Sequence, residues 1–239
     1  RGPAGRRARV IATPVRRGLS GIGRGSLPTV SARWAASTSG LPAASRRSGC
    51  CGSDFWSLPL FVILAPMSDI RSDQLREIRD AVVGLTSSPL YDERTRKGVY
   101  PVIGEGSHYA RLMLVGEAPG RTEAATGRPF VGAAGKVLDE LLASVQIDRA
   151  NVYITNIVKD RPPLNRDPLP EEIRAYGHFL DRQIAIIQPT VIAPLGRYAM
   201  GYIMSTFGME RVLEPISVMH GRTFSTTAPH GPVTIVPLY

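Results

Sequence analysis

A side-chain amide stands at the end of a short apolar stretch, where it can read the edge of a base. Asn156 follows the run Val152–Thr155, and its amide can accept one hydrogen bond while it donates another. This pair of contacts matches the N3–H and O4 edge of uracil and mismatches cytosine. The alternative is structural, because an Asn at the end of a strand often forms a turn.

An aromatic ring lies in a glycine-rich stretch earlier in the chain. Phe130 is the one aromatic residue of segment 126–135, and glycines stand on both sides of it at Gly127 and Gly132. Such a loop can leave the flat face of the ring open, so that a base can stack on it. A Phe that only plugs its own loop is the alternative.

The stretch Gly116–Gly120 (Gly-Glu-Ala-Pro-Gly) offers contacts to an anion. Its glycines let the backbone approach a ligand closely, and successive amide N–H groups can face a phosphate. The alternative is a tight turn with a solvated Glu117.

A basic loop follows Asn156. Lys159, Arg161 and Arg166 stand close to prolines that hold the chain extended, and their charges suit contacts to phosphate. A basic loop that is merely solvated is the alternative.

Strands and helices alternate along the chain and bring these loops together. Apolar stretches predict strands at 112–115, 152–155, 190–195 and 233–238. Helical spacing or a proline start predicts helices over 70–82, 137–145, 170–187 and 197–207. The alternation indicates an α/β fold, a three-layer α/β/α arrangement around a four-stranded, mostly parallel sheet. Ligands of such sheets bind at the carboxyl ends of the strands, so the loops after Val115, Thr155 and Leu238 are expected to carry the chemistry.

The first of these helices has a recognisable start and an apolar face. Ser68 is the expected N-cap, and the residues expected to face inward are Ile70, Leu75, Ile78 and Val82.

Charge and cysteine content divide the chain at Met67. Residues 1–66 contain ten Arg and one acid, whereas residues 67–239 contain nineteen basic and nineteen acidic residues. A nucleic-acid argument must therefore rest on local basic loops of the folded part. The two cysteines, Cys50 and Cys51, both precede Met67, which excludes a disulfide framework or a structural zinc site built by cysteines in 67–239.

The two regions are expected to differ in order. Residues 1–66 are rich in Arg, Ser, Gly, Ala and Pro and have no sustained apolar period, so we expect a disordered leader before a domain over 67–239. Upstream sequence translated through a mis-annotated start, a targeting segment and a basic tethering arm are the open interpretations. The longest apolar run, Leu60–Ala65, is much shorter than the about 20 residues that cross a bilayer, so no membrane association is expected.

Taken together, the loops closely resemble those of the family 4 uracil-DNA glycosylases. The matching stretches are 115–120 (VGEAPG), 127–135 (GRPFVGAAG), 152–159 (VYITNIVK) and 161–168 (RPPLNRDP). The resemblance extends over roughly 85–239. Several motifs in the same order and spacing make it specific.

The resemblance implies a role for each loop. Glu117 and Asn156 would be catalytic, and uracil would contact Gly116, Ala118, Phe130 and Asn156. The residues implied to contact DNA are Pro119, Gly120, Lys159, Arg161, Asn165 and Arg166. Another branch of the superfamily has an acidic, water-activating residue at the position of Ala118, so a weaker general base is expected here.

Two departures from the family are visible. Members usually hold a 4Fe–4S cluster through four cysteines, whose equivalents lie near Leu85 and Ser88, at Asp160 and at Tyr176. Because none of these is Cys, we expect no cofactor, packing by Tyr176, Leu85 and their neighbours in its place, and a neighbouring Arg as the partner of Asp160. Members also carry a catalytic His-Pro element after the last strand, which we expect to be missing from a truncated C-terminus.

None of the four histidines of the chain occupies the position of that His-Pro element. His108, His178, His220 and His230 are each expected to be surface or loop residues.

The function that these features predict is hydrolysis of the N-glycosidic bond of deoxyuridine in DNA. A uracil-DNA-binding protein without turnover, one that traps DNA covalently, and a glycosylase for another deaminated base are the alternatives. A monomer in the cytoplasm of a bacterium or archaeon, associated with the nucleoid, is expected, with uracil-containing DNA as its partner.

Overall fold

The structure is a computed structural model, and it describes residues 69–239. The expectations for the leader 1–66 and for Ser68 lie outside the described residues. Among the helices of the described part, none combines the length and the hydropathy that a membrane span requires.

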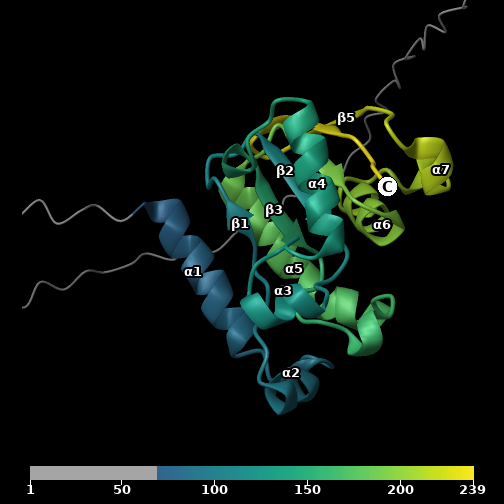
Figure 1. The fold of residues 1–239 in the computed structure, drawn as a ribbon. Coiled ribbons are helices and arrows are strands. Elements are labelled where there is room, and N and C mark those ends of the chain that lie inside the picture. Colours follow the sequence, from purple (N-terminus) through teal and green to yellow (C-terminus); the bar gives the residue numbers. More distant parts are fainter. Residues whose placement is uncertain (1–68) are drawn as a thin grey trace, which may run out of the picture. The chain divides into compact units, whose positions relative to one another are not determined.

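Six strands form one sheet in the order β1–β3–β2–β4–β6–β5 (Figure 1). The four central strands β3, β2, β4 and β6 are parallel to one another, whereas the edge strands β1 and β5 are antiparallel to the strands they pair with. The bounds are β1 Glu105–Gly106, β2 Leu112–Gly116, β3 Tyr153–Asn156, β4 Val191–Pro194, β5 Phe224–Ala228 and β6 Gly231–Ile235.

The predicted α/β fold is confirmed, but the sheet has six strands instead of four. The two additional strands are both at edges: β1 has two residues, and β5 (Phe-Ser-Thr-Thr-Ala) has no apolar run. Neither carries the hydrophobic pattern by which a strand is detected in a sequence. The last parallel strand ends at Ile235, and Leu238 continues it only as an isolated bridge to Leu195.

Alternate residues of the central strands point to two hydrophobic cores, one on each face of the sheet. Met113 and Val115 of β2 point to the core that α1, α5 and α6 cover, and Leu114 points to the core beneath α4. Figure 1 shows α4 and α5 on opposite faces of the sheet, as three layers require. The period of two along a strand therefore fixes which layer each side chain joins.

The α-helices are α1 Ile70–Val83, α2 Tyr91–Lys97, α3 Arg121–Thr126, α4 Ala133–Ser144, α5 Pro170–Ile187, α6 Arg197–Thr206 and α7 Ile216–Met219. Short 3₁₀ turns lie at Arg149–Asn151, Pro163–Asn165 and Glu210–Val212. The sequence predicted α1, α4, α5 and α6. It missed α2, α3 and α7, which have at most seven residues and thus no measurable apolar period.

The start of α1 differs from the prediction. Asp69 is the N-cap and accepts a hydrogen bond from Arg71 N at 3.2 Å. Leu75 and Ile78 are buried as predicted, but Ile70 is 72% exposed. The first turn of α1 lies at the C-terminal end of α5, where Arg71 binds the carbonyl of Ile187 at 3.0 Å, so α5 does not extend far enough to cover Ile70.

Candidate active site

Three of the predicted loops meet in a hollow of about 360 Å³. Ala118 and Gly120 come from the loop after β2, Phe130 from the loop before α4, and Asn156 and Asn165 from the end of β3 and the loop beyond it. We call this cavity the base hollow. It lies at the carboxyl ends of two neighbouring parallel strands, the edge at which α/β sheets bind ligands.

Gly116 lies where the amide of Asn156 and the ring of Phe130 converge. A Cβ atom at position 116 would overlap Asn156 Oδ1 and would lie only 2.6 Å from Phe130 Cζ. β2 and β3 pair Gly116 directly with Asn156. The missing side chain therefore allows the amide and the ring to share one wall of the hollow.

A carboxylate that the sequence reasoning missed fixes the Phe130 loop. Glu123 Oε1 accepts hydrogen bonds from Val131 N at 3.0 Å and from Gly132 N at 2.7 Å. Phe130 itself has a φ of 51°, a left-handed backbone conformation that non-glycine residues adopt rarely. An acid in the first turn of a helix that follows a glycine-rich loop is the signal that could have identified Glu123.

The aromatic ring is also held from the next helix. The carbonyl of Phe130 lies against Gly135 so closely that any Cβ at position 135 would overlap it. Gly135 is in the first turn of α4, so this glycine lets the helix begin directly behind the Phe130 loop.

Glu117 points away from the base hollow and lies in a smaller hollow of about 140 Å³ beside it. Its Oε1 accepts a hydrogen bond from Tyr198 N at 3.2 Å, in the first turn of α6. Burial raises the pKa of the Glu117 carboxyl, and this effect outweighs the Tyr198 N–H, which lowers it. Ala118 shares both hollows, with a methyl group where a general base would otherwise stand.

Lys159 does not belong to a DNA-binding surface. Its side chain is 0% exposed, and its ammonium group binds oxygens of Thr155, Asn156 and Gln183. The predicted phosphate contact of Lys159 is therefore wrong. The charge on Lys159 suggested a solvated position, but the side chain folds back under β3.

Arg161 and Arg166, the other two basic residues of the loop, differ in how many of their N–H groups bind other residues of the protein. Arg166 forms a two-pronged ion pair with the buried Glu172, at 2.9 and 2.6 Å, so much of its hydrogen-bonding capacity is used within the protein. Arg161 binds the side chain of Asn165 through Nε at 2.6 Å and leaves its terminal nitrogens outside any hydrogen bond of the described residues. Leu164, between them, is 93% exposed.

Three of the residues at the positions implied for cluster ligands, Ser88, Asp160 and Tyr176, meet in the structure. Tyr176 Oη lies 2.6 Å from Ser88 Oγ and donates to Asp160 Oδ2 at 2.5 Å. Arg94 binds Asp160 Oδ2 at 3.1 Å and also donates to the carbonyls that end α1. We call Ser88, Arg94, Asp160 and Tyr176 the Asp160 network.

The Asp160 network does not fit a 4Fe–4S cluster. Its side chains present hydroxyl, carboxylate and guanidinium groups bonded to one another, whereas such a cluster is held by thiolates. The expected Arg partner of Asp160 is confirmed as Arg94. Tyr176 was expected to replace the cluster by packing, and the structure adds its hydrogen bonds to Ser88 and Asp160. Within the described residues, no group of three or more His, Cys, Asp or Glu side chains could hold a metal ion.

The histidines lie at the surface or in loops, as predicted. His178 and His220 are exposed, His108 binds Ser72 and His230 binds the carbonyl of Pro189. None of the four lines the base hollow.

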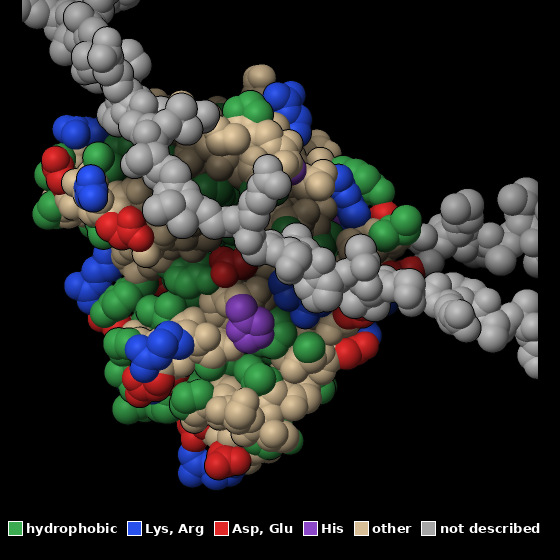
Figure 2. Space-filling view, turned by 180° about the vertical axis from the view of Figure 1, so that it is seen from behind, with side chains coloured by type: hydrophobic (Ala, Val, Ile, Leu, Met, Phe, Trp, Pro, Cys, Tyr) green, Lys and Arg blue, Asp and Glu red, His purple; other side chains and the backbone are tan. Residues whose placement is uncertain are grey.

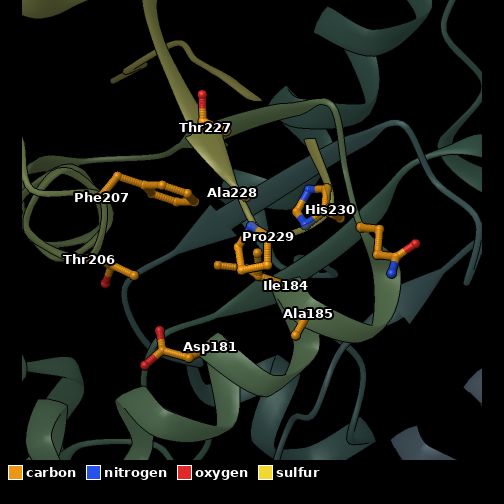
Figure 3. Close-up of a pocket in the computed structure, with 10 residues that line it drawn as sticks. Asp181, Ile184, Ala185, Thr206, Phe207, Thr227, Ala228, Pro229 and His230 are labelled. Carbon is orange, nitrogen blue, oxygen red and sulfur yellow. The ribbon is translucent and has the colours of Figure 1, made fainter. Parts of the chain in front are cut away.

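A larger hollow of about 460 Å³ lies apart from these loops (Figure 3). Figure 3 shows Phe207 and His230 on either side of Pro229, with Ile184 and Ala185 of α5 below. Its wall includes the turn between β5 and β6, which is at the amino end of the parallel strands. This hollow contains none of the predicted site residues and is at the wrong edge of the sheet for them.

On one face of the domain the charges are dispersed (Figure 2). On the face seen in Figure 2, Lys and Arg side chains alternate with Asp and Glu side chains and do not gather in one basic patch. This agrees with the balanced charge of residues 67–239.

Known proteins share much of this sequence. The family model described as "Uracil DNA glycosylase superfamily" matches residues 103–239. A type-4 uracil-DNA glycosylase of Archaeoglobus fulgidus is 46% identical over 138 residues, which cover 58% of this chain and 68% of the relative. The corresponding enzyme of Sulfurisphaera tokodaii is 40% identical over 168 residues, covering 70% and 74%. That of Thermotoga maritima is 47% identical over 134 residues, covering 56% and 68%.

Proposed function

The chain belongs to the uracil DNA glycosylase superfamily, and from this premise we propose that it excises uracil from DNA. Water would replace the base at C1′ of the sugar, so that the bond between C1′ and N1 breaks and uracil leaves with a proton. The product in the DNA would be an abasic site. The reaction belongs to the hydrolysis of N-glycosidic bonds.

One observation carries the proposal: Asn156 and Phe130 share a wall of the base hollow only because position 116 has no side chain. A base that has left the stack can lie flat on the Phe130 ring while the amide of Asn156 pairs with its edge. The amide accepts from N3–H and donates to O4, which favours uracil over cytosine.

Leaving-group stabilisation would supply more of the rate than water activation. The developing uracil anion can accept a hydrogen bond from Asn156, and a preorganised donor of this kind stabilises the charge that develops in the transition state. Ala118 offers no acid or base in the base hollow. Glu117, in the adjacent hollow, can stabilise the positive charge that develops on the sugar.

DNA would be held mainly by Arg161 and by the backbone of the loop after β2. Arg161 keeps free N–H groups, whereas Arg166 is committed to Glu172. Pro119, Gly120 and Asn165 line the small hollow between these loops. We propose uracil-containing DNA as the partner, a monomer as the working form, a cytoplasmic, nucleoid-associated location, and activity without a cofactor.

The test is release of uracil from a labelled oligonucleotide under single-turnover conditions. Alkali-labile strands are expected from the unchanged protein, and Asn156→Asp is expected to lose about 1–3 kcal/mol of transition-state stabilisation and some of its preference for uracil over cytosine. Asn151→Asp, at an exposed position in a 3₁₀ turn, is the matched control and should release uracil at the parent rate.

Three results would contradict the proposal. An SDS-stable shift without alkali-labile strands would indicate covalent trapping, and a native shift alone would indicate binding without turnover. Release of another deaminated base in preference to uracil would indicate a different substrate.

A further inference from the structure

Lys159 is fully buried, and its ammonium group lies among oxygen atoms. Nζ is 2.7 Å from the carbonyl oxygen of Asn156, 2.9 Å from Thr155 Oγ1 and 2.6 Å from Gln183 Oε1. An ammonium group has three N–H donors, so each of these oxygens can receive one.

The oxygens around Lys159 are themselves fixed by a second set of bonds. Thr155 Oγ1 donates to the carbonyl of Ile103 at 2.6 Å, and Gln183 Nε2 donates to the same carbonyl at 2.9 Å. Gln183 Nε2 also lies 3.1 Å from Tyr153 Oη. The ammonium therefore ties the end of β3 to α5 and to the segment before β1.

No carboxylate balances this charge. Within the described residues, Lys159 forms no ion pair, and Asp160, the next residue, turns to Arg94 and Tyr176 instead. The burial of a charge without an opposite charge is costly, and titratable groups in such surroundings cluster at functional sites.

The contact with Asn156 links Lys159 to the base hollow. Lys159 binds the main-chain carbonyl of Asn156, while the side chain of the same residue forms the wall of the hollow beside Gly116. On the other side, Ile157 N donates to the carbonyl of Gly116 at 2.9 Å. The peptide group that follows Asn156 is thus held at both its oxygen and its nitrogen.

We propose that Lys159 is a positioning residue, whose ammonium group holds the main chain of Asn156 so that the amide side chain meets the base. The inference rests on the proposed function of the base hollow. It assigns Lys159 to the reaction, and not to the DNA surface that its charge suggested.

Positioning by Lys159 would depend on pH, because a neutral amine has two N–H groups and would leave one of the three oxygens without a donor. Burial lowers the pKa of Lys159 to about 7. From β3, Tyr153, whose pKa burial raises, is connected to Lys159 through Gln183, and α5 contributes that neutral Gln183. The segment before β1 contributes a carbonyl.

A double-mutant cycle tests the proposal through the single-turnover rate of uracil release. Lys159→Met keeps a long side chain and removes the donors, and we expect a loss on the order of 100-fold, as for other small misplacements of a reacting group. In an Asn156→Ala background the same change should cost less than about threefold, because the residue that Lys159 positions is gone. A loss of equal size in both backgrounds would overturn the proposal.

The pH profile is the second readout, which general damage to the fold would not change. The rate of the unchanged protein should fall on the alkaline side as Lys159 loses its proton, and this limb should be absent from Lys159→Met. Parallel profiles would overturn the proposal. If Lys159→Met does not fold, the proposal would be overturned by an unchanged protein whose rate of uracil release stays constant on the alkaline side.

Lys97→Met, at an exposed ion pair of α2, is the matched control and should leave the rate and the profile unchanged. If the unchanged protein releases no uracil, the proposed function fails, and the same cycle is measured on its affinity for uracil-containing DNA. Coupling between Lys159 and Asn156 in that affinity would still support the positioning role, and its absence would refute it.

Discussion

The base hollow and the Asp160 network lie at the two ends of segment 156–160, and their construction differs. Asn156 faces a hollow bounded by glycines and by a ring on a left-handed backbone, so space is kept open. Asp160 faces Tyr176 and Arg94, which fill the space and satisfy its hydrogen bonds. The chemistry of the base hollow therefore depends on which side chains line it. The stability of the Asp160 network depends on each buried polar group having its hydrogen-bond partner.

Burial raises the pKa of a carboxyl group in both regions. It raises the pKa of Asp160 despite the nearby Arg94 and Tyr176, and it raises the pKa of Glu117 beside the base hollow. In the network, the buried charge holds segments together that are far apart in the sequence. Substitutions should therefore affect stability in the network and activity at the hollow.

The largest expected effect is that of Asp160→Ala on stability. It leaves Arg94 buried and unpaired, so the free energy of unfolding should fall by about 3–5 kcal/mol. Urea denaturation measures the change. Asp80→Ala, at an exposed ion pair of α1, should cost less than about 1 kcal/mol, and equal losses for the two variants would contradict the role of the network.

Gly116→Ala should show the opposite pattern, with loss of activity and little loss of stability. The new methyl group displaces Asn156 Oδ1 and the Phe130 ring, and uracil release should fall about 100-fold, equivalent to ~2.7 kcal/mol. Gly201→Ala, in α6 with open space around it, is the control and should keep full activity. Normal activity of Gly116→Ala would show that the convergence at Gly116 does not matter.

Tyr176→Phe removes one hydroxyl group from the Asp160 network and keeps the ring. Ser88 and Asp160 each lose a partner, so we expect a loss of about 1–3 kcal/mol in the free energy of unfolding, at unchanged rates of uracil release. Tyr202→Phe, whose hydroxyl binds the exposed Asp181, serves as the comparison and should cost less. A slower reaction of Tyr176→Phe would connect the two regions.

The smallest expected effect is the pH dependence of stability at Glu117. Because the folded state raises the pKa of this carboxyl above 4.5, its contribution to stability is greatest at low pH and is lost as pH rises through the raised value. Calorimetry between pH 4 and 8 should show a decline that is smaller in Glu117→Gln than in the unchanged protein, because the raised pKa of Asp160 contributes a decline of its own. Glu140→Gln, on the exposed side of α4, should keep the decline, and an identical decline in Glu117→Gln would contradict the assignment.

Local patterns in the sequence were sufficient for the central fold and for the base hollow. The four parallel strands each carry an apolar run, and Asn156 and Phe130 stand in loops whose glycines mark close approach. The antiparallel edge strands and the short helices were not predicted, because they bury too few apolar side chains to show a hydrophobic period in the sequence. Site residues on predicted loops could be named because a parallel sheet brings its carboxyl ends to one edge.

Only the tertiary structure decided where the charged side chains point. Arg94 and Asp160 are 66 residues apart, Ser88 and Tyr176 are 88 apart, and no spacing in the sequence pairs them. Lys159 illustrates the same limit, since its sequence neighbours suggest a solvated basic loop while its acceptors include Gln183 of a later helix. The cost of burying a charge is offset by partners that only the folded chain brings within hydrogen-bonding distance, and the sequence alone does not reveal them.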